Sequence, residues 1–159
     1  MGCAHSKGVL GRCYLGGYGV AEDDAKAVSL GRESAAAGSC MGQFVVGVCY
    51  DLGRGVAKDY AEALRLWRLA AAQGHAAAQY NLGAKFNNGE GVVQDYAEAV
   101  RLYRLAAVQG HAIAQYNLGL KFELGRGVAQ DDAEAIRFYR LAAAQGRAEA
   151  TAPLKRLGA

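Results

Sequence analysis

The chain lacks proline almost entirely, with Pro153 as the single one among 159 residues, and it has no apolar run long enough to cross a lipid bilayer. Scarce proline beside 22 glycines favours turns between helices over a low-complexity linker. No basic segment followed by an apolar stretch opens the sequence, so we expect no secretory signal peptide and a cytoplasmic location. A net charge of +3 is too weak to indicate a nucleic-acid partner.

Metal-binding and catalytic patterns are also missing. The four cysteines, Cys3, Cys13, Cys40 and Cys49, form no Cys-x-x-Cys pair, so a zinc site has no support. Thiols stay reduced in the cytoplasm, and we expect free cysteines, no metal and no cofactor. No nucleophile elbow, Walker lysine or isolated acid pair is present. The sequence therefore predicts a protein that is not an enzyme.

What the sequence does have is an internal repeat of 36 residues, visible first in its glycines. One glycine series consists of Gly11, Gly47, Gly83 and Gly119, and aromatic residues recur as Tyr14, Tyr50, Phe86 and Phe122. We therefore predict four repeats, at residues 4–39, 40–75, 76–111 and 112–147. Residues 1–3 form an N-terminal tail, and residues 148–159 are expected to form a C-terminal capping helix.

Each repeat is predicted to contain two helices. In the third repeat, apolar residues at helical spacing favour a first helix from Ala76 to Phe86. The second helix is expected to open at Asp95, an N-cap residue with Glu98 three positions later, as in a capping box. Gly110 is the expected C′ residue that ends it. Since one pair cannot bury both of its faces, the repeats predict an all-α solenoid.

Two features of the glycines add to this prediction. Gly83 lies inside a helix, where it costs up to ~1 kcal/mol relative to alanine, so its recurrence indicates a close helix–helix contact. Gly89 and Gly91 are expected to supply positive φ in the turn. In the first repeat, Gly31 stands where Trp67 stands one repeat later, so we expect that helix to be the least stable.

The repeat resembles the Sel-one-like repeat (SLR) family, a relative of the tetratricopeptide repeat, over about residues 4–147. The matching residues of the third repeat are Ala76, Leu82, Gly83, Phe86, Gly89, Glu90, Gly91, Val92, Asp95, Ala99, Ala106, Ala107 and Gly110. The resemblance implies a right-handed superhelix of antiparallel helix pairs. It also implies an adaptor or scaffold role in protein complexes.

In such arrays the first helix of each pair lines a concave surface, which is our candidate partner site. Its residues are Phe44, Val45, Val48, Tyr80, Asn81, Lys85, Tyr116, Asn117 and Lys121. We expect them to bind a peptide or helix of another protein. The alternative is that they only pack against neighbouring helices or face water. The apolar part of this surface could also be covered by self-association.

Two other recurring groups favour structural roles. Arg65, Arg101 and Arg137 each follow a glutamate by three residues, which indicates a solvated helix face rather than a grip for an acidic partner. His75 and His111 lie one repeat apart without an accompanying cysteine or acid motif. We expect both to lie at helix junctions.

The N-terminus supports a different hypothesis. Met1-Gly2-Cys3-Ala4-His5-Ser6 fits the myristoylation pattern, and Cys3 could be palmitoylated. Two acyl chains would hold a lipid-anchored adaptor on a membrane. Against this, a repeat helix starting at Ala4 would compete with the acyltransferase for the chain end. A further alternative is a small-ligand-binding or hydrolase-like repeat protein.

Overall fold

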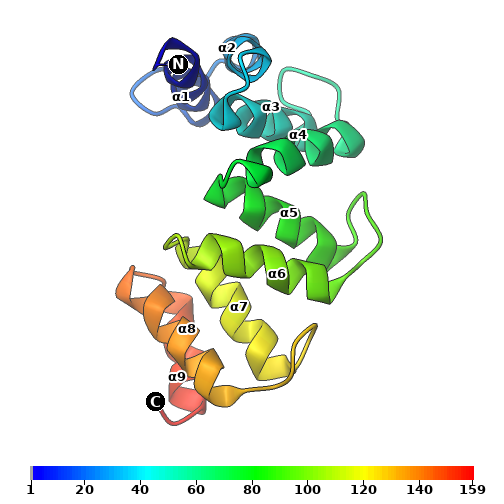
Figure 1. Cartoon of the computed structure of the whole chain (residues 1–159). Coiled ribbons are helices and arrows are strands. Elements are labelled where there is room, and N and C mark those ends of the chain that lie inside the picture. The colour runs from blue at the N-terminus through cyan, green and yellow to red at the C-terminus, as the bar shows by residue number, and fades with distance from the viewer. Residues whose placement is uncertain (1) are drawn as a thin grey trace. The chain divides into compact units, whose positions relative to one another are not determined.

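All regular structure is helical in the computed structural model, which describes residues 2–159 and, from Ala4 on, their side chains (Figure 1). The helices are α1 Gly2–Gly16, α2 Asp24–Ala36, α3 Cys40–Leu52, α4 Tyr60–Ala72, α5 Ala76–Asn88, α6 Tyr96–Ala107, α7 Ala112–Leu124, α8 Asp132–Ala144, the 3₁₀ turn η1 Ala148–Ala150 and α9 Thr151–Arg156. The all-α prediction is confirmed. The chain forms two compact units, an N-terminal unit Met1–Ala78 and a C-terminal unit Gln79–Ala159.

Hydrogen bonds at both ends of α5 and α6 establish that these two helices run antiparallel. The backbone N–H of Asp95, just before α6, donates to the carbonyl of Phe86 near the end of α5, at 2.9 Å. Just beyond the other end of α6, the side-chain amide of Gln109 donates to that of Gln79 at 2.8 Å. The second helix of the pair therefore folds back along the first.

Aspartate N-caps start the second helix of every pair. The Asp95 carboxylate accepts a hydrogen bond from the Glu98 backbone N–H at 3.0 Å, which confirms the predicted cap. The other half of the capping box is wrong. The Glu98 carboxylate receives two hydrogen bonds from Arg101, while the N–H of Asp95 is already bonded to Phe86. Glutamate at this position supports the helix through an ion pair on its exposed face.

The end of α6 has the hydrogen bonds of a Schellman motif. Gly110 has a φ of 84° and its N–H donates to Ala107 at 3.0 Å, while the N–H of His111 donates to Ala106 at 3.1 Å. The prediction that Gly110 is the C′ residue is therefore confirmed. Gly89 in the preceding turn also has a positive φ, of 72°, as predicted.

The recurring helical glycine is where an aromatic ring of the partner helix lies. A Cβ atom added to Gly83 in α5 would lie 2.9 Å from the Tyr103 ring on α6, and Tyr103 is only 2% exposed. Gly119 in α7 faces the Tyr139 ring of α8 in the same way, at 2.8 Å. No real Cβ atom fits at such distances, so the predicted close helix–helix contact is confirmed.

The helices of the first repeat pack without an aromatic ring between them at the recurring glycine. In the second repeat the ring of Trp67 lies against Gly47. In the first repeat Gly31 of α2 stands in the place of Trp67, so no ring is available to lie against Gly11. A Cβ atom on Gly31 would lie 2.7 Å from Val46 of α3, and one on Gly11 would lie 3.4 Å from the Gly31 nitrogen. The helix backbones therefore approach closely and Val46 occupies the space beside Gly31. The lower stability of α2 stays a prediction.

Paired glutamines link each of the last three helix pairs, and sequence reasoning missed them. One glutamine of each pair is buried on the first helix, and the other follows the second helix. The pairs are Gln43 with Gln73, Gln79 with Gln109, and Gln115 with Gln145, at 2.8, 2.8 and 2.6 Å. Their constant separation of 30 residues in every repeat is the signal that could have identified them.

The C-terminal cap is shorter than predicted. Residues 148–159 form a 3₁₀ turn followed by the six-residue α9 instead of one helix. Leu154 and Leu157 are partly buried, and Arg156 pairs with Glu123 on α7. The apolar residues of the segment therefore cover the last pair and its charged residues lie outside, as expected of a terminal element.

Replacing the N-cap of α6 gives a first test. Asp95→Ala removes the acceptor of the Glu98 N–H and is expected to lower the free energy of unfolding by about 1 kcal/mol. Asp95→Asn, which keeps a side-chain oxygen at the cap, is the matched control and should change it by no more than about 0.3 kcal/mol. Urea unfolding followed by circular dichroism measures both. Equal losses in the two variants would contradict the capping role.

The described cysteines provide a second test. Cys13, Cys40 and Cys49 are free thiols, and Cys49 is fully buried. Burial, followed by the charge of Asp24, raises the pKa of the Cys49 thiol to about 11. Because the thiolate is the reactive form, iodoacetamide at about pH 8 should modify Cys40 well before Cys49. Peptide mass spectrometry checks this order, which must disappear in denaturant. Equal native rates would contradict the burial of Cys49.

Candidate functional site

In the N-terminal unit, two of the three predicted apolar partner residues reach the surface. Phe44 and Val48 of α3 are partly exposed. Val45 is fully buried in the core beside Val28, so the prediction that it lies on the partner surface is wrong. Phe44 also stacks on the ring of His75, with centroids 4.6 Å apart. One side of Phe44 is thus held by the protein and the other stays partly open.

These two residues line an apolar groove of about 500 Å³. Tyr18 and Leu52, which are 67% and 56% exposed, extend the groove. Its complete lining is Arg12, Leu15, Gly16, Tyr18, Phe44, Val48, Leu52, Arg54, His75 and Ala77. Exposed apolar side chains of this size around one hollow are typical of a contact surface.

One of the two arginines of the groove is already neutralised. Arg54 pairs with Glu22 at 2.8 Å and with Asp24 at 2.6 Å, and it donates to the backbone carbonyl of Leu15. Arg12 is exposed, and no carboxylate within the described part of the chain pairs with it. The groove therefore has an apolar floor with one unneutralised cation at its edge.

The two repeat-related histidines cap helices, as predicted for helix junctions. The Nδ1 atom of His75 accepts from the backbone N–H of Ala78 at 3.2 Å, and His111 does the same for Ala114. Burial lowers the pKa of His111, and the charge of Arg147 lowers it further. A neutral imidazole with Nδ1 as acceptor suits a cap at this position.

The tyrosines predicted for the partner surface pack partly against neighbouring helices. Tyr80 stacks on Tyr103 and on His111, with ring centroids 5.9 and 4.8 Å apart. Tyr116 lies beside Tyr139 at 5.6 Å. Each of the two stays partly exposed, as does Asn81. They serve packing and also leave some surface for a partner.

The two predicted lysines are nearly buried and have different partners. Lys85 is 8% exposed and pairs with Glu90 at 2.7 Å. Lys121 is 7% exposed, donates to the side chain of Asn87 and lies 4.3 Å from the centroid of the Tyr96 ring. Burial lowers the pKa of Lys121, and the nearby charge of Arg126 adds to that effect.

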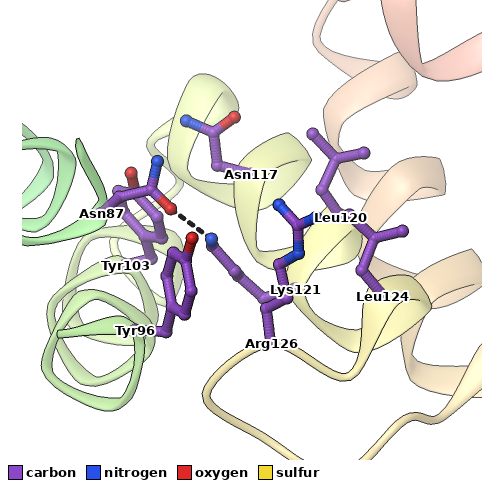
Figure 2. A pocket seen from close by; sticks show the side chains of 8 residues that line it. All are labelled: Asn87, Tyr96, Tyr103, Asn117, Leu120, Lys121, Leu124 and Arg126. Atoms are coloured by element: carbon purple, nitrogen blue, oxygen red, sulfur yellow. Dashed lines mark hydrogen bonds between the residues drawn. The ribbon is translucent and has the colours of Figure 1, made fainter. Parts of the chain in front are cut away.

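A second cavity, of about 210 Å³, surrounds Lys121 within the C-terminal unit (Figure 2). Its lining is Asn87, Tyr96, Tyr103, Asn117, Leu120, Lys121, Leu124 and Arg126. Of these, Asn117 and Lys121 were predicted as partner-binding residues. Asn87, Tyr96 and Arg126 were missed, although comparing Glu90 with Arg126, one repeat apart, gives a signal in the sequence.

The recurring arginines form a solvated helix face, as predicted. Arg65, Arg101 and Arg137 each donate two hydrogen bonds to the glutamate three residues before, and their side chains are more than half exposed. These exposed pairs contribute little to stability, and each arginine is already paired with a glutamate of its own helix.

The described residues meet neither the requirements of a metal site nor those of a membrane-spanning helix. Among the described residues, no three or more histidine, cysteine, aspartate or glutamate side chains gather where they could hold a metal ion. None of the described helices combines the length and apolar character needed to span a membrane. The lipidation hypothesis concerns Gly2 and Cys3. The Cys3 side chain lies outside the part of the chain that the structure describes, so the hypothesis stays a prediction.

Solved structures with the same helix pairs are known. A Sel1 repeat protein from Oxalobacter formigenes is 34% identical, with a TM-score of 0.86 over 96% of this chain and 62% of that protein. A protective antigen present in uropathogenic Escherichia coli strains, displaying an SLR fold, is 32% identical with a TM-score of 0.84 over 95% of this chain and 32% of that protein. This chain thus spans less than two thirds of either. The cysteine rich protein B of Helicobacter pylori, 18% identical with a TM-score of 0.64 over 81% of this chain and 92% of its own, shares the fold alone.

The family comparison assigns the repeats directly, while the search of curated proteins gave no match. Residues 9–39, 40–75, 76–111 and 112–146 each match the Sel1 repeat. Proteins built from these repeats generally act in protein–protein interaction, and the fold is typically a non-enzymatic scaffold. The matches cover most of the sequence, and the chain belongs to the Sel1 repeat family.

Proposed function

We propose that the protein is a non-enzymatic scaffold that binds a peptide or helix of a partner protein, using the apolar groove of its N-terminal unit. The observation that carries the proposal is the groove around Phe44 and Val48, which Tyr18 and Leu52 extend with largely exposed apolar side chains. Family membership supports the general role, because Sel1 repeat proteins generally act by binding other proteins.

The shape and chemistry of the groove favour a particular kind of segment. Its floor is apolar, so an amphipathic helix or an extended peptide can place its apolar side chains there. Arg12 at the edge has no carboxylate partner in the described part of the chain, whereas Arg54 is neutralised by Glu22 and Asp24. We expect the bound segment to carry an acidic residue beside its apolar ones.

Two side chains of the N-terminal unit, Cys49 and His75, bear on the alternative that the protein is a hydrolase. The thiol of Cys49, in the core of this unit, is fully buried and its pKa is raised by burial, which is the opposite of an activated nucleophile. His75 uses its Nδ1 atom to cap α5 and stacks on Phe44. Both side chains therefore have structural roles that favour binding over hydrolysis.

Leu52→Asp tests the groove. It places a charge on an exposed apolar side chain of the groove and is expected to weaken binding of the captured partner by about tenfold or more. The partner is identified by affinity capture from cells of the source organism, and its affinity for purified wild-type and variant protein is then measured by calorimetry.

The matched control is Val93→Asp, which introduces the same charge at a side chain that is 89% exposed and lies outside the groove. It should leave the affinity within about twofold. Equal affinities for wild type and Leu52→Asp, with both proteins folded by circular dichroism, would remove the groove from the proposed function.

A further inference from the structure

Equivalent positions in successive repeats show how the chain balances positive charge at the helix–turn junction. Arg54 in the second repeat occupies the position that Glu90 and Arg126 occupy in the third and fourth. The positive charge of Arg54 is neutralised by two carboxylates, because Glu22 and Asp24 both pair with it.

In the third repeat the charge is balanced in another way. Lys85 is nearly buried at 8% exposure, and Glu90 lies 2.7 Å from its ammonium group. A nearly buried ammonium group with a carboxylate beside it follows the general rule that charges removed from water are paired.

The fourth repeat keeps the cations and loses the carboxylates. Lys121 replaces Lys85 one repeat later, but Arg126 stands in place of Glu90. Gln94 and Tyr96, two repeats after Glu22 and Asp24, are uncharged. Two cations therefore lie together without the acids that balance them elsewhere.

The contacts of these two cations are neutral. Lys121 bonds the Asn87 amide, and both cations face the Tyr96 ring, at 4.3 Å for Lys121 and 5.9 Å for Arg126. No carboxylate in the part of the chain that the structure describes pairs with either of them. The burial of Lys121, followed by the repulsion from Arg126, lowers the pKa of Lys121, as expected of a cation that lacks a counter-charge.

A cavity is present where the counter-charge is lacking. Figure 2 shows the Lys121 and Arg126 side chains together in the pocket, with Tyr96 on one side and Leu120 on the other. The cavity of about 210 Å³ also has the Asn117 amide in its lining. The Asn117 amide is already hydrogen-bonded to Tyr103, so the two cations are the groups that can donate charge-assisted hydrogen bonds to an anion there.

We propose that this pocket binds a carboxylate group carried on a short apolar stem, supplied by the side chain or the C-terminus of a partner peptide. The walls favour a carboxylate over phosphate, because Leu120, Leu124 and the Tyr96 ring are apolar, and the N-terminus of α6 at Tyr96 is already capped by the Asp95 carboxylate. The peptide source rests on the proposed scaffold function, but the pocket itself is defined by the C-terminal unit alone.

A small-molecule titration tests the pocket without any partner. The full chain labelled with ¹⁵N is titrated with 4-methylpentanoate, a carboxylate on an apolar stem, and with the neutral 4-methylpentanamide. The carboxylate should shift the signals of Lys121 and Arg126 with saturation in the millimolar range, at about 10 mM or below, and the amide should not. The absence of saturable shifts, or equal shifts with the amide, would overturn the proposal.

Arg126→Glu gives the sharpest variant, because it copies the Lys85–Glu90 arrangement of the third repeat. It should weaken 4-methylpentanoate binding by at least about tenfold, since an internal carboxylate then neutralises Lys121. Arg140→Glu makes the same change of charge at an exposed position outside the pocket and is the matched control. Equal weakening by both variants would show non-specific attraction and contradict the pocket. Arg126→Gln provides the same comparison if Arg126→Glu does not fold.

Two short peptides then separate the sources of the carboxylate. N-acetyl-Leu-Glu-amide presents a side-chain carboxylate, and N-acetyl-Ala-Leu presents a C-terminal one. Binding of either identifies the source, and binding of neither, while 4-methylpentanoate binds, overturns the peptide source. If Leu52→Asp does not weaken partner binding, the proposed role of the groove fails, but the result of the 4-methylpentanoate titration is unaffected. The failure of the proposed function and the failure of this pocket are therefore distinguishable.

Discussion

The contact on which the rest of the structure depends is an aromatic ring lying directly on the backbone of a helical glycine. At Gly83 the ring of Tyr103 occupies the space that a Cβ atom would need, and Gly119 and Tyr139 repeat the arrangement. A close approach of this kind fixes both the separation and the register of the two helices, because the ring fits only where the side chain is missing. The glycine lowers helix propensity, and the buried ring offsets that cost through the apolar area it removes from water.

The fixed register of the helix pairs allows equivalent residues of successive repeats to be compared. Because the helix pairs repeat with a period of 36 residues, side chains one period apart occupy equivalent surroundings, and a difference between them reports a local change of role. Glu90 and Arg126 are the clearest case, since the same place in the fold holds the counter-charge of a lysine in one repeat and a second cation in the next. The two binding sites that we propose both involve residues near the ends of the first helices, where such substitutions occur.

The sequence predicted what depends on local chemistry. The cap at Asp95, the positive φ of Gly89 and the Schellman glycine Gly110 follow from residue type and spacing, and all are confirmed. The Glu98 half of the capping box failed because the N–H it was expected to bond already donates to Phe86, a contact between two helices that no local pattern reveals.

The candidate site was only partly predictable for a related reason. Periodicity indicates which residues lie on the first helix of each pair, but it does not indicate how deeply each one is buried. Val45 was therefore predicted to lie on the surface, although it lies in the core. Likewise the Lys121 pocket depends on Tyr96 and Arg126, which come from a helix and a turn outside the first-helix pattern. Sequence spacing identifies faces, whereas cavities depend on how several elements pack.

A double-mutant cycle on Gly83 and Tyr103 tests most directly whether the helix pair depends on the Tyr103 ring lying against the Gly83 backbone. In the wild-type background, Gly83→Ala should lower the free energy of unfolding by about 1–3 kcal/mol, because the new methyl group collides with the ring. In the Tyr103→Leu background the same substitution should be neutral or stabilising by up to ~1 kcal/mol, because alanine is the better helix former and the ring is gone. An identical effect of Gly83→Ala in both backgrounds would contradict the account.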